Sequence, residues 1–418
     1  MRGLFEASLR PSGPLGALRS PNFRLFWTAS MAAFTGHHIR IFAQPYLVYQ
    51  LTGSPLLLGI TGAFVALPAI AFTFPAGALA DRMDRRLLIM LAQGLAGVLT
   101  LVLALDVALG WVEVWHVWAF AFILGIYWAF ERPARQAIIP SLLDSREALP
   151  SAIALNSILW QMGRIVGPGL AGAVIALGGV AAPFFLTASG FLLLLLALRR
   201  LPKMPPPQPK ARRSMAEDLW EGFQFIGRDP VFFTLIGLSI YAGFFGLVYV
   251  QFLAVFADEH GVGAVQFGLM GTVIGIGAVL GGTTVAFLGK RIQQGQLLLG
   301  SGVAFGLSLT AFAQAPTFPM ALALLATTGF TVSFFHVGIQ TVLQILVPDA
   351  LRGRVMAIQS LNLDMNHLGA TPLGATADQI GIRATVAIWG LLVAGGAIVA
   401  AVVPQVRRLR EQPSPERV

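Results

Sequence analysis

The sequence predicts an all-α membrane protein with about twelve transmembrane helices, as judged from its composition, its apolar runs and the position of its charges. Hydrophobic residues make up 56% of the 418 residues, charged residues only 11%, and the mean hydropathy is +0.75. A soluble domain carries charge on about a quarter of its residues. This chain therefore has too little charge to form a water-soluble surface.

Apolar runs near the length of a membrane-spanning helix, roughly 20 residues, occur six times before a polar interruption at 201–230 and six times after it. The first run is long for a single span, and Pro45 is a natural break point within it. The chain thus divides into a first half, 22–200, and a second half, 231–404. The predicted spans are 22–50, 54–79, 87–110, 114–136, 152–176, 180–200, 231–257, 263–288, 296–314, 318–345, 353–377 and 383–404.

The basic residues alternate between loops, and this alternation predicts the orientation. In the loops that follow odd-numbered spans, Arg383 is the only basic residue. By the positive-inside rule, the N-terminal segment 1–21, the linker 201–230 and the tail 405–418 are cytoplasmic. The net charge of +9 therefore reflects topology and does not indicate a nucleic-acid partner. The basic clusters on the predicted cytoplasmic side include Arg82, Arg85, Arg86, Arg135, Arg146, Lys290, Arg291, Arg352, Arg354, Arg407, Arg408 and Arg410.

The linker combines a proline-rich connector with a predicted interfacial helix. It begins LPKMPPPQPKARR, which is typical of an extended segment. In the stretch that follows, Leu219, Trp220, Phe223 and Ile226 fall on one helical face. We expect this helix to lie at the membrane interface, docked beneath the helix bundle.

Sequence features recur six spans apart. Gln136-Ala-Ile-Ile-Pro140 ends the fourth span, and Gln344-Ile-Leu-Val-Pro348 ends the tenth. Gly77 with its basic pair after the second span corresponds to Gly282 and Lys290-Arg291 after the eighth. Duplicated six-helix halves are typical of secondary transporters, which bind their substrate between the halves near the middle of the membrane.

The loop after the second span reads Gly77-Ala-Leu-Ala-Asp81-Arg82-Met-Asp84-Arg85-Arg86. This segment resembles the loop motif of the major facilitator superfamily, G-x-L-A-D-R-x-G-R-R. The resemblance implies the major facilitator fold and a gating role for Gly77, Asp81, Arg82, Arg85 and Arg86. An acid at a helix end can pair with a cation, or accept from a helix N-terminus, in one conformation only. A basic loop that only sets topology is the alternative.

This sequence departs from the family pattern at two places in the motif and its repeat. Asp84 stands where the family usually has glycine. In the second half, Ala286 occupies the position that corresponds to Asp81. We therefore expect one gate of this kind, in the first half.

The fifth span contains a second motif, Gly163-Arg-Ile-Val-Gly167-Pro168-Gly-Leu-Ala-Gly172. It resembles the antiporter motif of the same superfamily, G-x-x-x-G-P-x-x-G-G, with Ala171 in place of one glycine. Small residues allow close helix packing, and proline removes a backbone donor. The resemblance implies an exporter, and ordinary small-residue packing is the alternative.

Longer stretches narrow the resemblance. The segments YQLTGSPLLLGI, ERPARQAIIPSLLDSREALPSAIALNSI and VPDALRGRVMAI are similar to the bacterial branch that includes enterobactin-type and macrolide-type exporters. The similarity runs from Asn22 to Pro404. It implies a multi-pass protein of the bacterial plasma membrane that exports a small molecule.

Ionisable residues inside predicted spans are costly and are therefore candidates for function. Asp364 lies ten residues beyond Arg354 in the eleventh span, which corresponds to about 15 Å along a helix. His367 follows nearly one turn later, and Asn362 and Asn366 flank the acid. A carboxyl group there can carry a proton, and a structural hydrogen bond across helices is the alternative.

Four more residues complete the candidate coupling network: Arg40 and His37 in the first span, Glu131 in the fourth and Arg164 in the fifth. We expect Glu131 to form a local ion pair with the arginines that follow it, Arg132 and Arg135. The resemblance implies a structural pairing for Arg164. His37 stands where relatives commonly carry an acid, so their proton coupling does not transfer directly to this chain. No metal-ligand spacing accompanies His37.

A polar stripe marks the tenth span, where His336, Gln340 and Gln344 recur at four-residue intervals. Spans one, four, seven and ten line the cavity in the family that the chain resembles. The stripe is therefore expected to line the cavity.

Several classes of function are excluded by missing motifs. The chain has no cysteine, no phosphate loop and neither G-x-S-x-G nor H-E-x-x-H, so we expect no enzyme, cofactor or metal. The leading hypothesis is a monomeric, proton-coupled exporter of a hydrophobic or amphipathic small molecule that works by alternating access. A lipid or siderophore exporter of the same fold is one alternative. A non-transporting membrane receptor or scaffold is the other.

Overall fold

The computed structural model describes residues 13–80, 83–203, 215–288, 295–360, 362–407 and 409. Within these residues the secondary structure consists of helices, without strands. The side chains of residues 73–75, 77, 78, 80, 215, 216, 218, 219 and 362–364 lie outside the described set.

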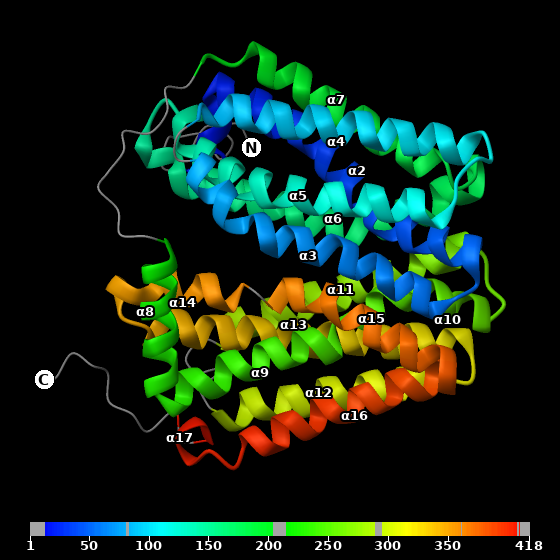
Figure 1. Cartoon of the computed structure of the whole chain (residues 1–418). Coiled ribbons are helices and arrows are strands. Elements are labelled where there is room, and N and C mark those ends of the chain that lie inside the picture. Colours follow the sequence, from blue (N-terminus) through cyan, green and yellow to red (C-terminus); the bar gives the residue numbers. More distant parts are fainter. Residues whose placement is uncertain are drawn as a thin grey trace, which may run out of the picture. The chain divides into compact units, whose positions relative to one another are not determined.

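The helices follow the predicted spans closely (Figure 1). Those before the linker are α2 (Pro21–Thr52), α3 (Pro55–Ala80), α4 (Arg85–Ala108), α5 (Val114–Ile138), α6 (Leu149–Gly178) and α7 (Ala182–Arg200), with the short 3-10 helices η1 (Gly16–Arg19), η2 (Ile139–Leu142) and η3 (Arg146–Ala148). Those from the linker onward are α8 (Met215–Arg228), α9 (Pro230–Gly246), η4 (Val248–Phe252), α10 (Leu253–Glu259), α11 (Ala264–Leu288), α12 (Gly295–Ala313), α13 (Phe318–Leu346), α14 (Asp349–Gln359), α15 (Asn362–Ile380), α16 (Ile382–Ala400) and α17 (Pro404–Arg407).

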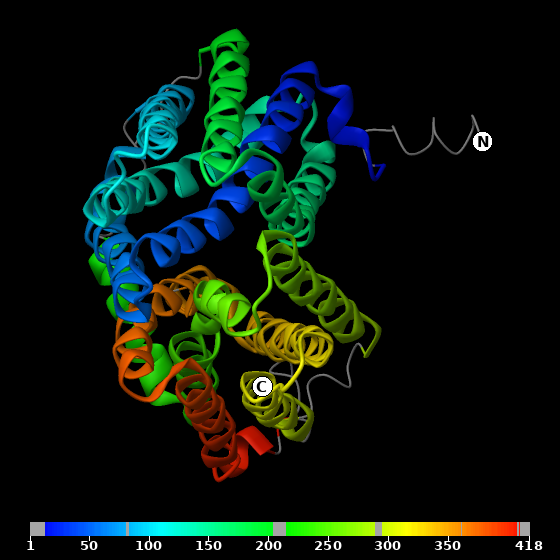
Figure 2. The same cartoon turned by 90° about the vertical axis from the view of Figure 1, so that its right-hand side faces the viewer.

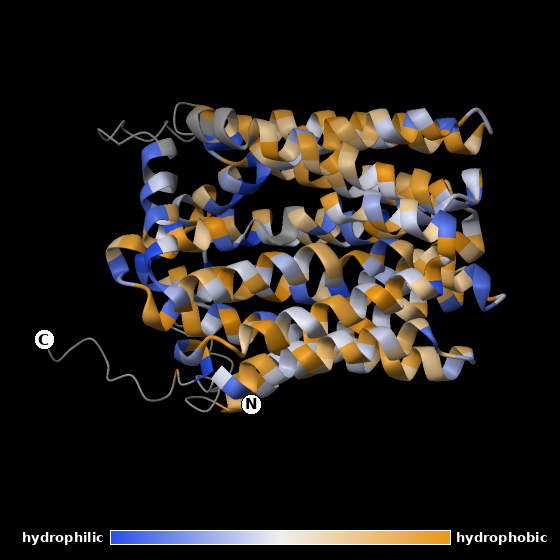
Figure 3. Cartoon of the chain, turned by 60° about the horizontal axis from the view of Figure 1, so that its bottom comes forward, coloured by the Kyte–Doolittle hydropathy of each residue, from blue (hydrophilic) through white to orange (hydrophobic). Residues whose placement is uncertain are grey.

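Among the described residues, ten helical segments are long and apolar enough to cross a membrane. The two predicted spans outside these ten are α2 and α15. Both are rich in polar residues: α2 holds His37, His38 and Arg40, and α15 holds Asp364 and His367. Figure 3 shows that apolar residues cover most of the helices while polar residues gather near their ends. The predicted all-α membrane class is confirmed.

The chain divides into two units, each described by itself. The first contains α2, α4, α5, α6 and α7, most of α3, and residues 263–269. Within it, α2 packs against α6 and α7, and α4 packs against α5 and α7. Figures 1 and 2 show these helices side by side.

The second unit contains the helices from α8 to α17, except for the start of α11, together with residues 54–63 at the start of α3. Within it, α12 packs against α13 and α16, and α9 packs against α15 and α16. Phe232, Leu235 and Phe335 lie in its apolar core. The helices α3 and α11 therefore each contribute to both units.

Three predictions about helix continuity need correction. Pro45 does not end the first span, because α2 continues through it to Thr52. The seventh span is interrupted after Gly246 by the 3-10 helix η4. The run 353–377 is divided between α14 and α15, and Asp364 lies in the first turn of α15.

The linker helix α8 docks against α14. The carboxylate of Glu221 lies 2.8 Å from the guanidinium of Arg354. The predicted single apolar face is divided, because Ile226 is buried at 5% exposure while Trp220 and Phe223 are 65% and 48% exposed. The side chain of Leu219 lies outside the described residues. Ile226 therefore lies on the side of α8 that packs against the protein, whereas Trp220 and Phe223 lie on its exposed side.

Candidate functional site

The loop motif is described only in its second part. Asp81 and Arg82 lie outside the described residues, and so does the environment of Gly77. Asp84 is the N-cap of α4, and its carboxylate accepts hydrogen bonds from the backbone N–H groups of Arg86 at 2.8 Å and Leu87 at 3.4 Å. The acid that replaces the family's glycine thus satisfies free donors at a helix start.

The two arginines of the motif bind the carboxyl ends of other helices. Arg85 donates to the carbonyl oxygen of Ala137, in the last turn of α5, at 2.8 Å. Arg86 donates to the carbonyl oxygens of Leu198 at 2.6 Å and Arg199 at 2.9 Å, in the last turn of α7. A cation is favourable at a helix C-terminus, where unpaired carbonyls concentrate negative charge. The basic pair therefore ties α4 to the ends of α5 and α7.

The glycine motif of α6 packs against two different helices. A Cβ atom at Gly163 would collide with the imidazole ring of His38, and one at Gly167 would lie 2.5 Å from the His38 Cβ. The Cα of Gly172 faces Ala264 and Gly268 at the start of α11. Pro168 lies inside α6, which continues through it to Gly178. The glycines of the motif thus allow α2 and α11 to pack closely against α6.

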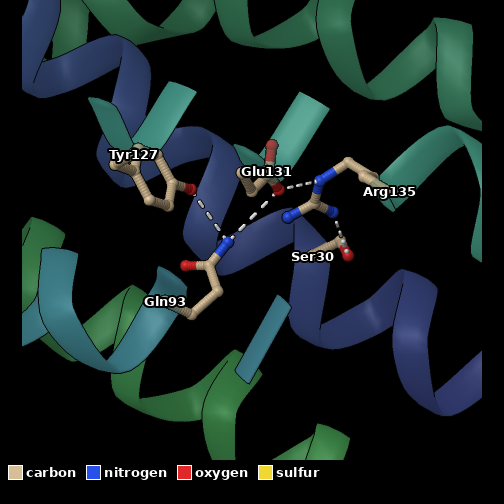
Figure 4. Close-up of polar contacts among 5 residues, drawn as sticks. All are labelled: Ser30, Gln93, Tyr127, Glu131 and Arg135. Atoms are coloured by element: carbon tan, nitrogen blue, oxygen red, sulfur yellow. Dashed lines mark hydrogen bonds and ion pairs between the residues drawn. The ribbon is translucent and has the colours of Figure 1, made fainter. Parts of the chain in front are cut away.

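A buried polar network links α2, α4 and α5 (Figure 4). Glu131 forms an ion pair with Arg135, one turn further along α5, and both side chains are at most 6% exposed. Gln93 of α4 donates to the Glu131 carboxylate at 3.3 Å and to the Tyr127 hydroxyl at 3.0 Å. Arg135 also donates to the Ser30 hydroxyl of α2 at 3.0 Å. Its guanidinium lies 4.7 Å from the ring centre of Phe34.

This network contains the predicted local ion pair, with Arg135 rather than Arg132 as the partner of Glu131. Gln93, Tyr127 and Ser30 were not predicted. Gln93 had a detectable signal, since it is the single amide in α4 and lies within its largely apolar middle part. Ser30 and Tyr127 had no such signal in the sequence, because their roles depend on which helices pack next to each other.

Arg40 and His37 lie together on α2. One Arg40 amino group donates to the Gln44 side-chain oxygen at 2.6 Å, and the other lies 3.4 Å from His37 Nδ1. The guanidinium also lies 5.8 Å from the ring centre of Phe120. By contrast, Arg164 is exposed on α6.

Aromatic rings surround the two adjacent histidines. The His37 ring lies 4.4 Å from Trp128, and the His38 ring lies 5.6 Å from Trp160, centre to centre. Both histidines are buried, whereas both tryptophans are half-buried. His38 Nδ1 lies 2.9 Å from the Phe34 carbonyl oxygen, the geometry of a hydrogen bond one turn back along α2.

The candidates of the second unit do not form a comparable charge network among the described side chains. The Asp364 side chain lies outside them. The Gln251 amide donates to the Asn366 carbonyl and side-chain oxygens, each at 3.2 Å, and lies 3.4 Å from His367 Nδ1. Along α13, His336 is half-buried and Gln340 and Gln344 are exposed.

The start of α3 is held against α15 within the second unit. The Asp378 carboxylate accepts from the Ser54 hydroxyl at 3.0 Å and from the Leu56 N–H at 3.3 Å. Thr371 donates to the Gly59 carbonyl at 3.2 Å. An acid of α15 thus caps the first turn of α3.

Comparison with known proteins decides the family. Residues 12–416 match the major facilitator family described as "Transmembrane secretion effector". The chain belongs to this family. It is therefore a transporter of the major facilitator superfamily, as the loop motif predicted, and it is not an enzyme.

Relatives of this transporter include the enterobactin exporter EntS of Citrobacter koseri, which is 27% identical over 398 residues and covers 94% of both chains. The enterobactin exporter EntS of Escherichia coli is 27% identical over 399 residues, again with 94% of both chains covered. The predicted resemblance to this exporter branch is confirmed. With these relatives and its apolar helices, the transporter is a multi-pass protein of the bacterial inner membrane.

Solved structures show the same fold. A bacterial homologue of the human lysosomal transporter Spinster aligns with a TM-score of 0.74 at 17% identity, over 95% of this chain and 99% of that one. The nucleoside transporter NupG aligns with a TM-score of 0.70 at 15% identity, over 94% and 100%. Among the described residues of the transporter, no group of three histidine or acidic side chains is placed to hold a metal ion.

Proposed function

We propose that this transporter is a proton-coupled exporter of a hydrophobic or amphipathic small molecule and that it works by alternating access. The proposal goes beyond family membership in three respects: the coupling ion, the direction and the substrate class. Each has its own support.

Proton coupling is supported by the buried carboxylate of Glu131. Inside a membrane an acid is costly, and it is found where it serves a function. Glu131 is 2% exposed, and one of its carboxylate oxygens, Oε1, accepts from both Arg135 and Gln93. Protonation of this carboxyl group would remove the charge that holds Arg135 in place. A proton would thereby free the end of α5 from Ser30 of α2, which couples protonation to helix packing.

Asp364 is the second candidate for the proton carrier. This role is supported by the position of Asp364 near His367 in the sequence and by the free-energy cost of placing an acid inside a membrane span. The two acids lie in different units, so each requires its own test.

The export direction is supported by the α6 motif and by the relatives. The motif matches the antiporter pattern at fixed spacing through Gly163, Gly167, Pro168 and Gly172. The His38 side chain of α2 packs against Gly163 and Gly167. The relatives compared above are described as exporters.

The test measures transport in proteoliposomes with and without a pH gradient, for the wild type, Glu131→Gln and Asp364→Asn. A panel of fluorescent amphipathic compounds serves as substrate. We expect gradient-driven uptake into inside-out vesicles that a protonophore abolishes, and we expect loss of this drive in the variant that lacks the carrier. Glu147→Gln is the matched control, because Glu147 is an exposed acid in η3. Wild-type coupling in both variants would exclude both acids, and insensitivity to the protonophore would refute proton coupling.

A siderophore exporter is the alternative that a specific observation favours, since the relatives export enterobactin by name. Deletion cells starved of iron would then secrete less chelator than wild-type cells. Equal secretion would reject this alternative and leave the broader proposal in place.

A further inference from the structure

Arg40 is a buried cation whose neighbours are neutral. It lies near the middle of the 32-residue helix α2 and is 6% exposed. Its guanidinium contacts the Gln44 amide oxygen and His37 Nδ1, and among the described residues its buried Nε atom has no hydrogen-bond acceptor. Within the part of the chain that the structure describes, no carboxylate lies within ion-pair distance of it.

Arg135 provides the comparison inside the same unit. Its charge is balanced by Glu131, and a hydroxyl group satisfies a further donor. A buried charge that lacks such a partner is strongly unfavourable, because neither water nor an opposite charge compensates for its lost hydration. Among the described residues, no opposite charge thus balances the buried Arg40 guanidinium.

The helices around Arg40 also carry more positive than negative charge. Beyond the first turn of α2, the helices α2, α5 and α6 contain one acid, Glu131. They contain four arginines, namely Arg40, Arg132, Arg135 and Arg164. Arg132 and Arg164 are exposed, so the buried charges of these helices are Arg40, Arg135 and Glu131, with a net positive sign. A buried positive charge attracts anions.

Aromatic surface lies next to this cation. His37 connects the two, with Nδ1 3.4 Å from Arg40 and its ring centre 4.4 Å from that of Trp128. The rings of Trp128 and Trp160 are 6.3 Å apart and both are half-buried. Partly accessible tryptophans can stack on an aromatic ligand, with a cation alongside for its charge.

We propose that Arg40, Trp128 and Trp160 form a binding site for an aromatic small molecule that carries a carboxylate or phenolate group. The anion would pair with the Arg40 guanidinium, and the aromatic body would lie against the two tryptophans. This inference rests on the proposed function only in that the cargo is a small amphipathic molecule. It narrows the substrate class to aromatic anions and is independent of the coupling ion.

The test compares two probes that differ in one charge: dansylglycine and its methyl ester. Binding to the full-length protein purified in detergent is followed by dansyl fluorescence anisotropy, with empty micelles subtracted. At neutral pH we expect the acid to bind the wild type about tenfold or more tightly than the ester, since a buried charge-assisted hydrogen bond is worth about 1.5–3 kcal/mol. Equal binding of the two probes to the wild type would overturn the proposal before any variant is made.

The variants separate charge from shape. Arg40→Gln should reduce the preference for the acid to near unity, and Arg40→Lys should retain most of it. Arg24→Gln, which removes an exposed arginine near the start of the same helix, should leave it unchanged. Trp128→Leu should lower the binding affinity of both probes by a similar factor. A preference that survives Arg40→Gln, or binding that is unaffected by Trp128→Leu, would contradict the proposal.

These results are separable from the proposed function, because no gradient or membrane is present. Intact proton-driven transport of neutral compounds together with equal probe binding would overturn this inference alone. Selective binding of the acid without proton-driven transport would overturn only the coupling.

Discussion

His38 shows how a single side chain determines which helices can pack. Its imidazole fills the groove that two glycines leave open on α6, and the ring nitrogen turns back to the carbonyl of Phe34. The sequence predicted close packing along Gly163 and Gly167, but it did not identify the partner. That choice depends on the position of α2, which lies more than a hundred residues away in the chain.

At this residue scale, Gly163→Ala is expected to destabilise the protein, because the new Cβ would collide with the His38 ring. Overpacking of a close contact costs about 1–3 kcal/mol. Thermal unfolding in detergent measures the effect, and the double variant Gly163→Ala/His38→Ala should recover part of the loss.

Gly94→Ala on α4 is the matched control for this prediction. The nearest atom to its added Cβ is a Leu195 methyl at 4.0 Å, which is an ordinary contact. A Gly163→Ala variant as stable as Gly94→Ala would show that His38 does not fill the groove.

At the scale of elements, the basic pair of the loop motif connects helix ends. Arg86 reaches two carbonyls in the last turn of α7, and Arg85 reaches one in α5. Sequence reasoning placed both arginines in a gating loop. The structure adds a packing role, in which they balance the negative ends of two helices.

We expect Arg86→Ala to loosen the end of α7 and to lower the free energy of unfolding by about 1 kcal/mol, the typical net value of a lost hydrogen bond. Faster amide exchange over residues 195–201 is the local sign. Arg200→Ala removes a neighbouring exposed charge and is the control. Equal exchange in the two variants would mean that the contacts of Arg86 do not hold α7.

The elements themselves were predictable because a membrane imposes its length on them. Composition and apolar runs located the helices. The two less apolar spans, α2 and α15, carry four of the polar candidates, namely His37, Arg40, Asp364 and His367. The polar network was only partly predictable. Glu131 and Arg135 are one turn apart, whereas Gln93 and Ser30 meet them across 38 and 105 residues of sequence.

At the scale of the whole molecule, α3 and α11 are the helices that the two units share. The first turns of α3 belong to the second unit, where Asp378 caps them and Gly59 accepts from Thr371. The first turns of α11 belong to the first unit, where Gly268 meets Gly172 of α6. Under the proposed alternating access, we expect contacts made by these shared helices to form in one state and break in the other.

The absence of cysteine from the chain allows a direct test of this exchange. In the variant Ser54→Cys/Asp378→Cys, a short bis-methanethiosulfonate reagent should join α3 to α15 where the two side chains now lie 3.0 Å apart. We expect transport to fall to background after cross-linking and to return after reduction, because the joined helices can no longer separate. The pair Asp106→Cys/His116→Cys is the matched control, because it lies at a similar distance of 2.7 Å and joins α4 to α5, which both belong entirely to the first unit, whereas α3 is shared. Transport that continues with Ser54 and Asp378 cross-linked would show that the start of α3 remains on α15 throughout the cycle, and alternating access would then have to proceed without movement at this contact.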